Sequence, residues 1–141
     1  MPPKIKQTEG LFMSETQSVM CCITAQASCL AILLKGKELA EKIGCPVKAV
    51  TVQPIRAEAK RRSEDMICLD ELTRESGVEI DILYSDSPLL ALAEYAEQVL
   101  PLHIFTGKQA DRSSFVMKLA EYCKLPVSMV CGENVITVPT E

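Results

Sequence analysis

The chain has 141 residues, of which 48% are hydrophobic and 24% charged, and its formal net charge is −4. This length and apolar share predict one domain with a substantial core, and they argue against a disordered chain or a small disulfide-linked scaffold. Nucleic acid is disfavoured as a partner, because the chain is acidic and carries three tyrosines, three phenylalanines and no tryptophan for base stacking.

The sequence also bears on the compartment. No apolar run approaches the ~20 residues that cross a bilayer, and the first residues lack the basic start and apolar segment of a signal peptide. We therefore expect a cytoplasmic protein without membrane association. The seven cysteines are then expected to be reduced, and most of them to be small buried hydrophobic residues.

Residues 1–16 carry no periodic apolar pattern and include two prolines and several charges. They are predicted to form a mobile N-terminal tail, with Met13 as an alternative start. Residues 17–141 are predicted to form a single domain, in which short apolar runs alternate with longer amphipathic stretches.

The first apolar run, Val19–Ile23, predicts a strand, and a stretch with helical spacing follows it and ends at Gly44. The apolar positions predicted to face inward from this helix are Leu30, Leu33, Leu34, Ala40 and Ile43. Val47–Val52 predicts the second strand. A second helix is predicted from about Ala57 to Ser76, with Met66, Ile67, Leu69 and Leu72 facing inward and Gly77 ending it.

The third strand is predicted at Val78–Leu83, where Glu79 and Asp81 alternate with apolar residues, as suits the edge of a sheet. The helix after it has the clearest start, with Ser87 placed as N-cap and Pro88 in the first turn. Its apolar rhythm is carried by Leu89, Leu92, Ala93, Ala96, Val99 and Leu100.

Leu102–Phe105 predicts the fourth strand. The helix after it is predicted to begin near Asp111 as N-cap and to bury Phe115, Val116, Leu119 and Cys123. Val127–Val130 predicts the fifth strand. A last run, Val135–Val138, is predicted to add a short edge strand or to lie against a partner. This alternation predicts an α/β fold with an open parallel sheet and helices on both faces.

The segments Ser85–Ala96 (SDSPLLALAEYA) and Leu119–Val130 (LAEYCKLPVSMV) resemble the third helix and the last helix and strand of universal stress protein domains. Val19–Ile43 resembles more specifically the variant found in osmosensing potassium-regulating histidine kinases. The resemblance implies a doubly wound, Rossmann-like five-stranded parallel sheet of order 3-2-1-4-5. It also implies homodimers, commonly formed through the last strands, here Val135–Val138, and ATP binding in many members.

The family's phosphate motif, G-x2-G-x9-G-[S/T] after the fourth strand, is incomplete in this chain. Gly107 matches the first glycine, but Ala110 stands at the second, and Ala120 and Glu121 stand at the third glycine and the hydroxyl position. The loop after the first strand also lacks the aspartate that ATP-binding members typically carry. The resemblance therefore implies a degenerate nucleotide site with weak or no ATP binding.

A ligand-binding crevice is still predicted where the first and fourth strands end. Its candidate residues are Thr24, Gln26, Ser28, Val52, Gly107, Lys108, Arg112, Ser113 and Ser114. Lys108 and Arg112 would attract a small anion or a nucleotide near a helix N-terminus. The simpler interpretation is that Asp111 caps a helix and the two cationic side chains are solvated.

We therefore expect a dimeric regulatory or ligand-binding module without catalytic activity, cofactor or metal. A genuine ATP-binding stress protein is one alternative. A phosphocysteine carrier using Cys21 or Cys22 is another, because these residues end a strand before a serine-containing loop. No cysteine pair has C-x2-C spacing, and the single histidine, His103, lies within an apolar strand, where we expect it to be partly buried.

Overall fold

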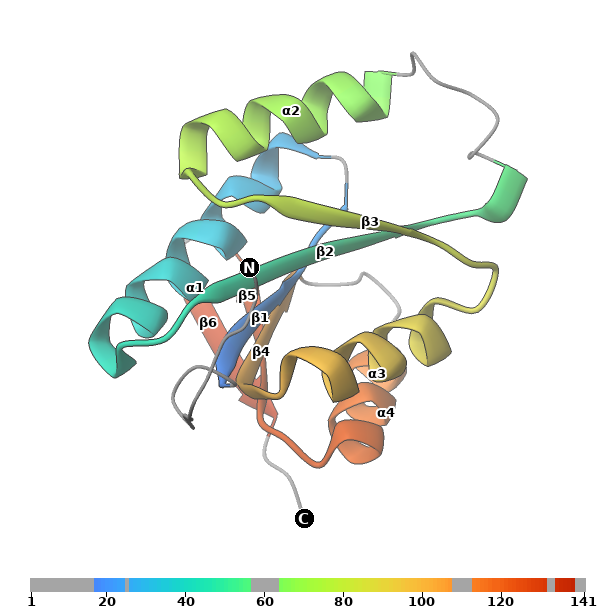
Figure 1. The fold of residues 1–141 in the computed structure, drawn as a ribbon. Helices are drawn as coiled ribbons and strands as arrows, with labels where there is room; N and C mark the ends of the chain where they lie inside the picture. The colour runs from blue at the N-terminus through green and yellow to red at the C-terminus, as the bar shows by residue number, and fades with distance from the viewer. Residues whose placement is uncertain (1–16, 25, 57–63, 108–112, 132–133, 139–141) are drawn as a thin grey trace, which may run out of the picture.

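The computed structural model describes residues 17–24, 26–56, 64–107, 113–131 and 134–138. They form a six-stranded sheet of order β3-β2-β1-β4-β5-β6, shown in Figure 1. The tail predicted at residues 1–16 lies outside the described residues. The strands are β1 Ser18–Cys22, β2 Val47–Gln53, β3 Ile80–Tyr84, β4 Pro101–Gly107, β5 Val127–Cys131 and β6 Asn134–Val138.

The strands β1 to β5 pair in parallel, and β6 pairs antiparallel with β5. The doubly wound α/β sheet predicted from the sequence is therefore confirmed, including the order of its first five strands. The run at Val135–Val138 is an edge strand within the chain's own sheet, because it folds back on β5.

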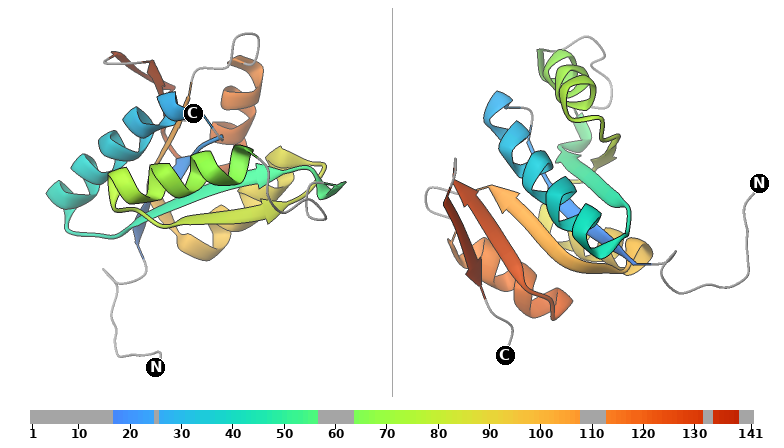
Figure 2. Two further views of the ribbon diagram at one scale, coloured as in Figure 1. Left: turned by 90° about the horizontal axis from the view of Figure 1, so that it is seen from above. Right: turned by 90° about the vertical axis from the view of Figure 1, so that its left-hand side faces the viewer.

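Four helices connect the strands: α1 Leu30–Ile43, α2 Glu64–Ser76, α3 Pro88–Val99 and α4 Ser113–Cys123. A short 3-10 turn, η2 at Ala27–Cys29, leads into α1. Helices α1 and α2 cover one face of the sheet and α3 and α4 the other, as the turned views of Figure 2 show. None of the helices in the described segments is long and apolar enough to cross a membrane.

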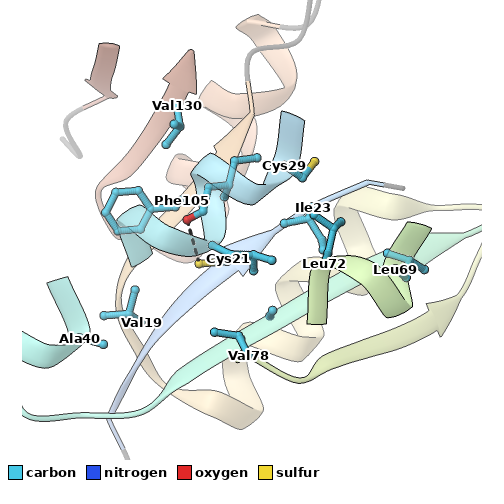
Figure 3. Close-up of a cluster of buried hydrophobic side chains, with 13 residues drawn as sticks. Val19, Cys21, Ile23, Cys29, Ala40, Leu69, Leu72, Val78, Phe105 and Val130 are labelled. Atoms are coloured by element: carbon cyan, nitrogen blue, oxygen red, sulfur yellow. Dashed lines mark hydrogen bonds between the residues drawn. The ribbon is translucent and has the colours of Figure 1, made fainter. Parts of the chain in front are cut away.

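The two faces of the sheet carry separate cores that share β1. Val19 and Cys21 belong to the cluster under α1 and α2, which Figure 3 shows, whereas Met20 and Cys22 belong to the cluster under α3 and α4. Val19, Met20 and Cys21 are fully buried. This alternation is that of a central strand buried on both faces, as the apolar run in the sequence predicts.

Some predicted inward positions are wrong. Leu34, Ile43 and Ile67 are 46%, 45% and 47% exposed, and Leu100 is 50% exposed just beyond the end of α3. The buried face of α1 is instead formed by Ile32, Leu33, Gly36 and Ala40. The apolar stripe of α1 is thus rotated relative to the prediction, because a glycine rather than a leucine meets the sheet at its centre.

The start of α3 also differs in detail. Ser87 occupies the N-cap position and Pro88 the first turn, but the Ser87 side chain makes no capping hydrogen bond. Instead, the Oγ atom of Ser85 accepts a hydrogen bond from the Ser87 backbone N–H at 3.0 Å. The N-cap predicted at Asp111 lies outside the described residues.

Candidate functional site

The candidate site lies at the carboxyl ends of β1 and β4. The register pairs Cys22 with Thr106, so the loop that follows β1 and Gly107 at the end of β4 lie beside each other. From this point the chain leaves β1 toward α1 on one face of the sheet and leaves β4 toward α4 on the other. Such a reversal of winding is where open α/β sheets bind ligands.

The loop after β1 is a tight turn with exposed side chains. The backbone N–H of Gln26 donates to the carbonyl of Thr24 at 2.9 Å, and the N–H of Cys29 donates to the carbonyl of Gln26 at 2.9 Å. The side chains of Thr24, Gln26 and Ser28 are exposed. All three sequence-predicted residues of this loop are therefore at the surface of the protein.

Cys29 organises the inner side of this loop, although sequence reasoning did not single it out. Its thiol is buried, and its Sγ atom accepts a hydrogen bond from the Thr24 N–H at 3.4 Å. The Thr24 Oγ1 atom lies 3.5 Å from the same sulfur. The one sequence signal for this role is that Cys29 directly precedes α1. This is the N-cap position of the helix, which serine or threonine more commonly occupies.

Gly107 ends β4 beside α1. A β-carbon at this position would lie 3.2 Å from the Cδ1 atom of Ile32, which is closer than ordinary van der Waals contact. The space that the missing side chain leaves is thus occupied by Ile32. The glycine therefore allows α1 to pack against β4. This packing explains the presence of a glycine at position 107 without a role in phosphate binding.

The remaining candidates are distributed differently. Val52 is half-buried in β2, where it packs against the core cluster under α3 and α4. Ser113 and Ser114 begin α4. Lys108 and Arg112 lie outside the described residues, so the cationic part of the predicted crevice stays a prediction.

The two cysteines of the carrier alternative are buried in β1. Cys21 is fully buried and Cys22 is 7% exposed. The Cys21 thiol donates a weak hydrogen bond to the carbonyl of Ile32 at 3.6 Å, the dashed line in Figure 3. Burial raises the pKa of Cys21 to about 12 and also raises the pKa of Cys22. Both groups are therefore thiols at neutral pH, whereas a nucleophile needs the thiolate.

His103 is half-buried in β4 and belongs to a polar chain across three strands. Its Nε2 atom lies 2.7 Å from the Oγ atom of Ser128 in β5, and that Oγ lies 2.8 Å from the Oγ1 atom of Thr137 in β6. Burial lowers the pKa of His103. Ser128 is only 1% exposed, so this serine–histidine contact joins strands and offers no accessible nucleophile.

The loops after β2 and β3 are tied together beside the site. The backbone N–H of Ile55 donates to the Oδ1 atom of Asp86 at 3.2 Å, and the N–H of Ser85 donates to the carbonyl of Gln53 at 2.8 Å. Among the described residues, no group of three or more histidine, cysteine, aspartate or glutamate side chains could hold a metal ion.

Comparison with known proteins gives structural relatives only. No protein-family model and no curated protein matches the chain. A universal stress protein from Archaeoglobus fulgidus is similar in structure, with a TM-score of 0.56 and 19% identity over 78% of this chain and 90% of that one. A universal stress protein from the same organism in complex with dAMP gives a TM-score of 0.56 and 20% identity, over 79% of this chain and 94% of that one.

A protein of the universal stress protein family from Burkholderia pseudomallei gives a TM-score of 0.57 and 16% identity, over 82% of this chain and 96% of that one. The described residues therefore have the fold of universal stress proteins, with β6 as an additional antiparallel edge strand. The more specific resemblance to osmosensing histidine kinases stays a prediction.

Proposed function

We propose that this chain is a non-catalytic, ligand-binding regulatory module whose crevice takes a small anion or a nucleotide, with weak or no affinity for ATP. The observation that carries the proposal is the pairing of Cys22 with Thr106, which brings the ends of β1 and β4 together where the winding reverses. The neighbouring fold with dAMP bound supports a nucleotide as the class of ligand.

Two features argue for weak triphosphate binding. Gly107 is the single glycine of its loop, and the room beside it is occupied by Ile32. A phosphate loop grips its ligand through several closely approaching backbone N–H groups, which needs open space around more than one glycine. The exposed donors of Thr24, Gln26 and Ser28 suit a smaller ligand held by side chains.

Calorimetry with dAMP, ATP and inorganic phosphate, with and without magnesium, tests the proposal. We expect dAMP or phosphate to bind, and the double variant Lys108→Gln/Arg112→Gln to weaken that binding by about tenfold. The matched control is Arg74→Gln/Lys118→Gln, which removes the same charge from exposed positions of α2 and α4. Equal binding by both double variants would contradict a crevice that recognises anions.

Micromolar ATP binding that Gly107→Val abolishes, in a variant that still folds by circular dichroism, would instead establish the ATP-binding alternative. Magnesium-dependent release of phosphate from ATP would contradict a non-catalytic module. The phosphocysteine alternative is disfavoured by the burial of Cys21 and Cys22, and phosphorylation of either thiol in the folded chain would restore it.

We further propose that two copies join through β6. In the described sheet β6 pairs only with β5, and Val135 and Ile136 are 40% and 51% exposed. An edge strand with exposed apolar side chains is a template for another strand. Sedimentation should show a dimer that Ile136→Asp dissociates and that Ile67→Asp, an equally apolar exposed site on α2, leaves intact. A monomeric parent chain would refute this interface.

A further inference from the structure

A second concave site lies at the β3 edge of the sheet, away from the crevice between β1 and β4. A hollow of about 430 Å³ is formed where the end of β3 meets α3, and its described lining includes Tyr84, Leu90, Ala91, Glu94, Tyr95 and Gln98. The five residues of α3 in this lining recur at the spacing of one helix face, so α3 provides one wall and β3 the other. The volume is within the range of small-molecule sites.

The described lining of this hollow carries negative charge and no positive charge. Glu94 is its only charged residue, and no lysine, arginine or histidine is among the described residues that line it. Glu94 is exposed, and its carboxylate forms no ion pair or hydrogen bond with another described residue. Its carboxylate is therefore available to a cation from solution.

A second carboxylate lies next to the wall. The Tyr95 hydroxyl donates to the Oδ2 atom of Asp81 in β3 at 2.6 Å, which fixes the tyrosine against the strand. Tyr95 is 6% exposed. This bond joins α3 to β3, so the hollow is bounded by two elements that are held at a set distance rather than by a loose groove.

The rest of the lining is suited to an apolar body. Leu83, Leu90 and Ala91 provide aliphatic surface and the half-buried Tyr84 adds aromatic surface, whereas the ring of Tyr95 is buried in the core under α3. A tyrosine ring beside a carboxylate favours organic cations, because an ammonium group is attracted both by the negative charge and by an aromatic face. An anion would be repelled by Glu94.

We propose that this hollow binds a small organic cation that joins a primary ammonium group to an apolar body, with Glu94 as the partner of the ammonium. This site is independent of the anion crevice at β1 and β4. It rests on the hollow itself, on the carboxylate of Glu94, on the Tyr84 ring and the aliphatic residues of the lining, and on the Tyr95–Asp81 hydrogen bond that holds the two walls together.

Three probes of one shape test the proposal: 2-phenylethylamine as the ammonium, 2-phenylethanol as the neutral form and phenylacetate as the anion. Titration is followed by amide shifts in the ¹⁵N-labelled chain. We expect the amine alone to give saturable shifts centred on residues 83–98, and Glu94→Gln to raise its Kd about fivefold or more. Leu90→Arg, at a side chain 47% exposed, places a cation in the wall and should abolish the shifts.

The matched control is Glu97→Gln, which removes the same charge from an exposed position of α3 outside the described lining. We expect it to leave the Kd unchanged. Equal Kd values for Glu94→Gln and the parent chain, equal shifts with 2-phenylethanol, or no shifts at about 10 mM amine would each overturn the proposal. Loss of amine binding in Glu97→Gln would also overturn it, since the effect would then be one of net charge.

Discussion

The backbone of Gly36 in α1 lies directly over the sulfur of Cys21 in β1, so close that a β-carbon on Gly36 would fall well inside van der Waals contact with Sγ. Gly36 and Cys21 are both buried. The contact sets how closely the first helix approaches the central strand, and so where the loop between them lies.

Gly36→Ala is expected to destabilise the fold by about 1–2 kcal/mol, because overpacking at the Cys21 sulfur outweighs the better helix propensity of alanine. Urea unfolding measures this change. In a Cys21→Ala background the sulfur is absent, so the same substitution should be neutral or stabilising. A Gly36→Ala cost that is equal in both backgrounds would show that the sulfur is not the obstacle.

Tyr95→Phe removes the hydroxyl that donates to Asp81 at 2.6 Å. We expect a loss of about 1 kcal/mol, since a hydrogen bond to a carboxylate is lost but the carboxylate stays exposed to water. Chemical denaturation measures it. Tyr122→Phe is the control, because Tyr122 is 58% exposed, and it should change stability by less than about 0.5 kcal/mol. An unchanged stability in Tyr95→Phe would mean that the hydrogen bond between α3 and β3 does not contribute to the free energy of unfolding.

Alkaline pH should weaken the fold through the thiols of β1. Burial raises the pKa of Cys21 from the usual 9.0 to about 12, and it raises the pKa of Cys22 as well. Below 9.0 the thiols are neutral in both states and their contribution is complete. As pH rises further, only the unfolded chain ionises, so each thiol costs about 1.4 kcal/mol of stability per pH unit.

Urea unfolding at about pH 8 and about pH 10 should therefore show a smaller pH-dependent loss in Cys22→Ala than in the parent chain. Cys68→Ala provides the comparison, because Cys68 is only half-buried in α2. The interpretation fails if Cys22→Ala and Cys68→Ala reduce the loss equally.

His103 should titrate below the usual pKa of 6.5, because burial disfavours the imidazolium. Its contribution to stability is then complete above 6.5 and is lost as pH falls, since the unfolded chain binds the proton first. It is the single histidine of the chain, so its imidazole C–H resonances can be followed without ambiguity by NMR. A measured pKa at or above 6.5 would contradict the burial of the ring between β4 and β5.

Leu100 adopts a left-handed backbone with φ 49° immediately after α3. Its side chain is 50% exposed, so it contributes little packing. Leu100→Gly should stabilise the fold by about 0.5–1 kcal/mol, because glycine adopts this conformation without steric cost. Leu100→Ala separates the two effects, since it loses the side chain but keeps the strain. Thermal unfolding should place the glycine variant above both others, and a lower midpoint for glycine than for alanine would refute the argument.

The sheet could be predicted from the sequence because its central strands are short apolar runs and its edge β3 alternates. Which face of α1 is buried could not be predicted, since the residue that faces Cys21 is Gly36, and a glycine adds nothing to an apolar pattern. Ile32 is apolar but was missed, because the inward stripe was placed on neighbouring leucines such as Leu30 and Leu34 instead. The start of α3 was located correctly from Pro88, but which serine satisfies its backbone depended on the turn geometry of Ser85.

The candidate site was located by topology rather than by a motif. The ends of β1 and β4 could be placed together from the strand order that the family resemblance implied. The role of Gly107 could not, because its contact with Ile32 joins residues that are distant in the sequence. The hollow beside Tyr95 depends equally on the meeting of β3 with α3 and leaves no local pattern.

The place of β1 between β2 and β4 has a consequence for how the chain folds during synthesis. The ribosome releases β1, β2 and β3 well before β4, so one edge of β1, all five residues of which are buried in the folded chain, stays unpaired until β4 is made. The Ser18 hydroxyl donates a hydrogen bond to the carbonyl of Val99 at 2.7 Å, and these two residues are 81 positions apart in the sequence. Contacts this remote form slowly, and a nascent chain that ends before Pro101 leaves the β4-facing edge of β1 unpaired.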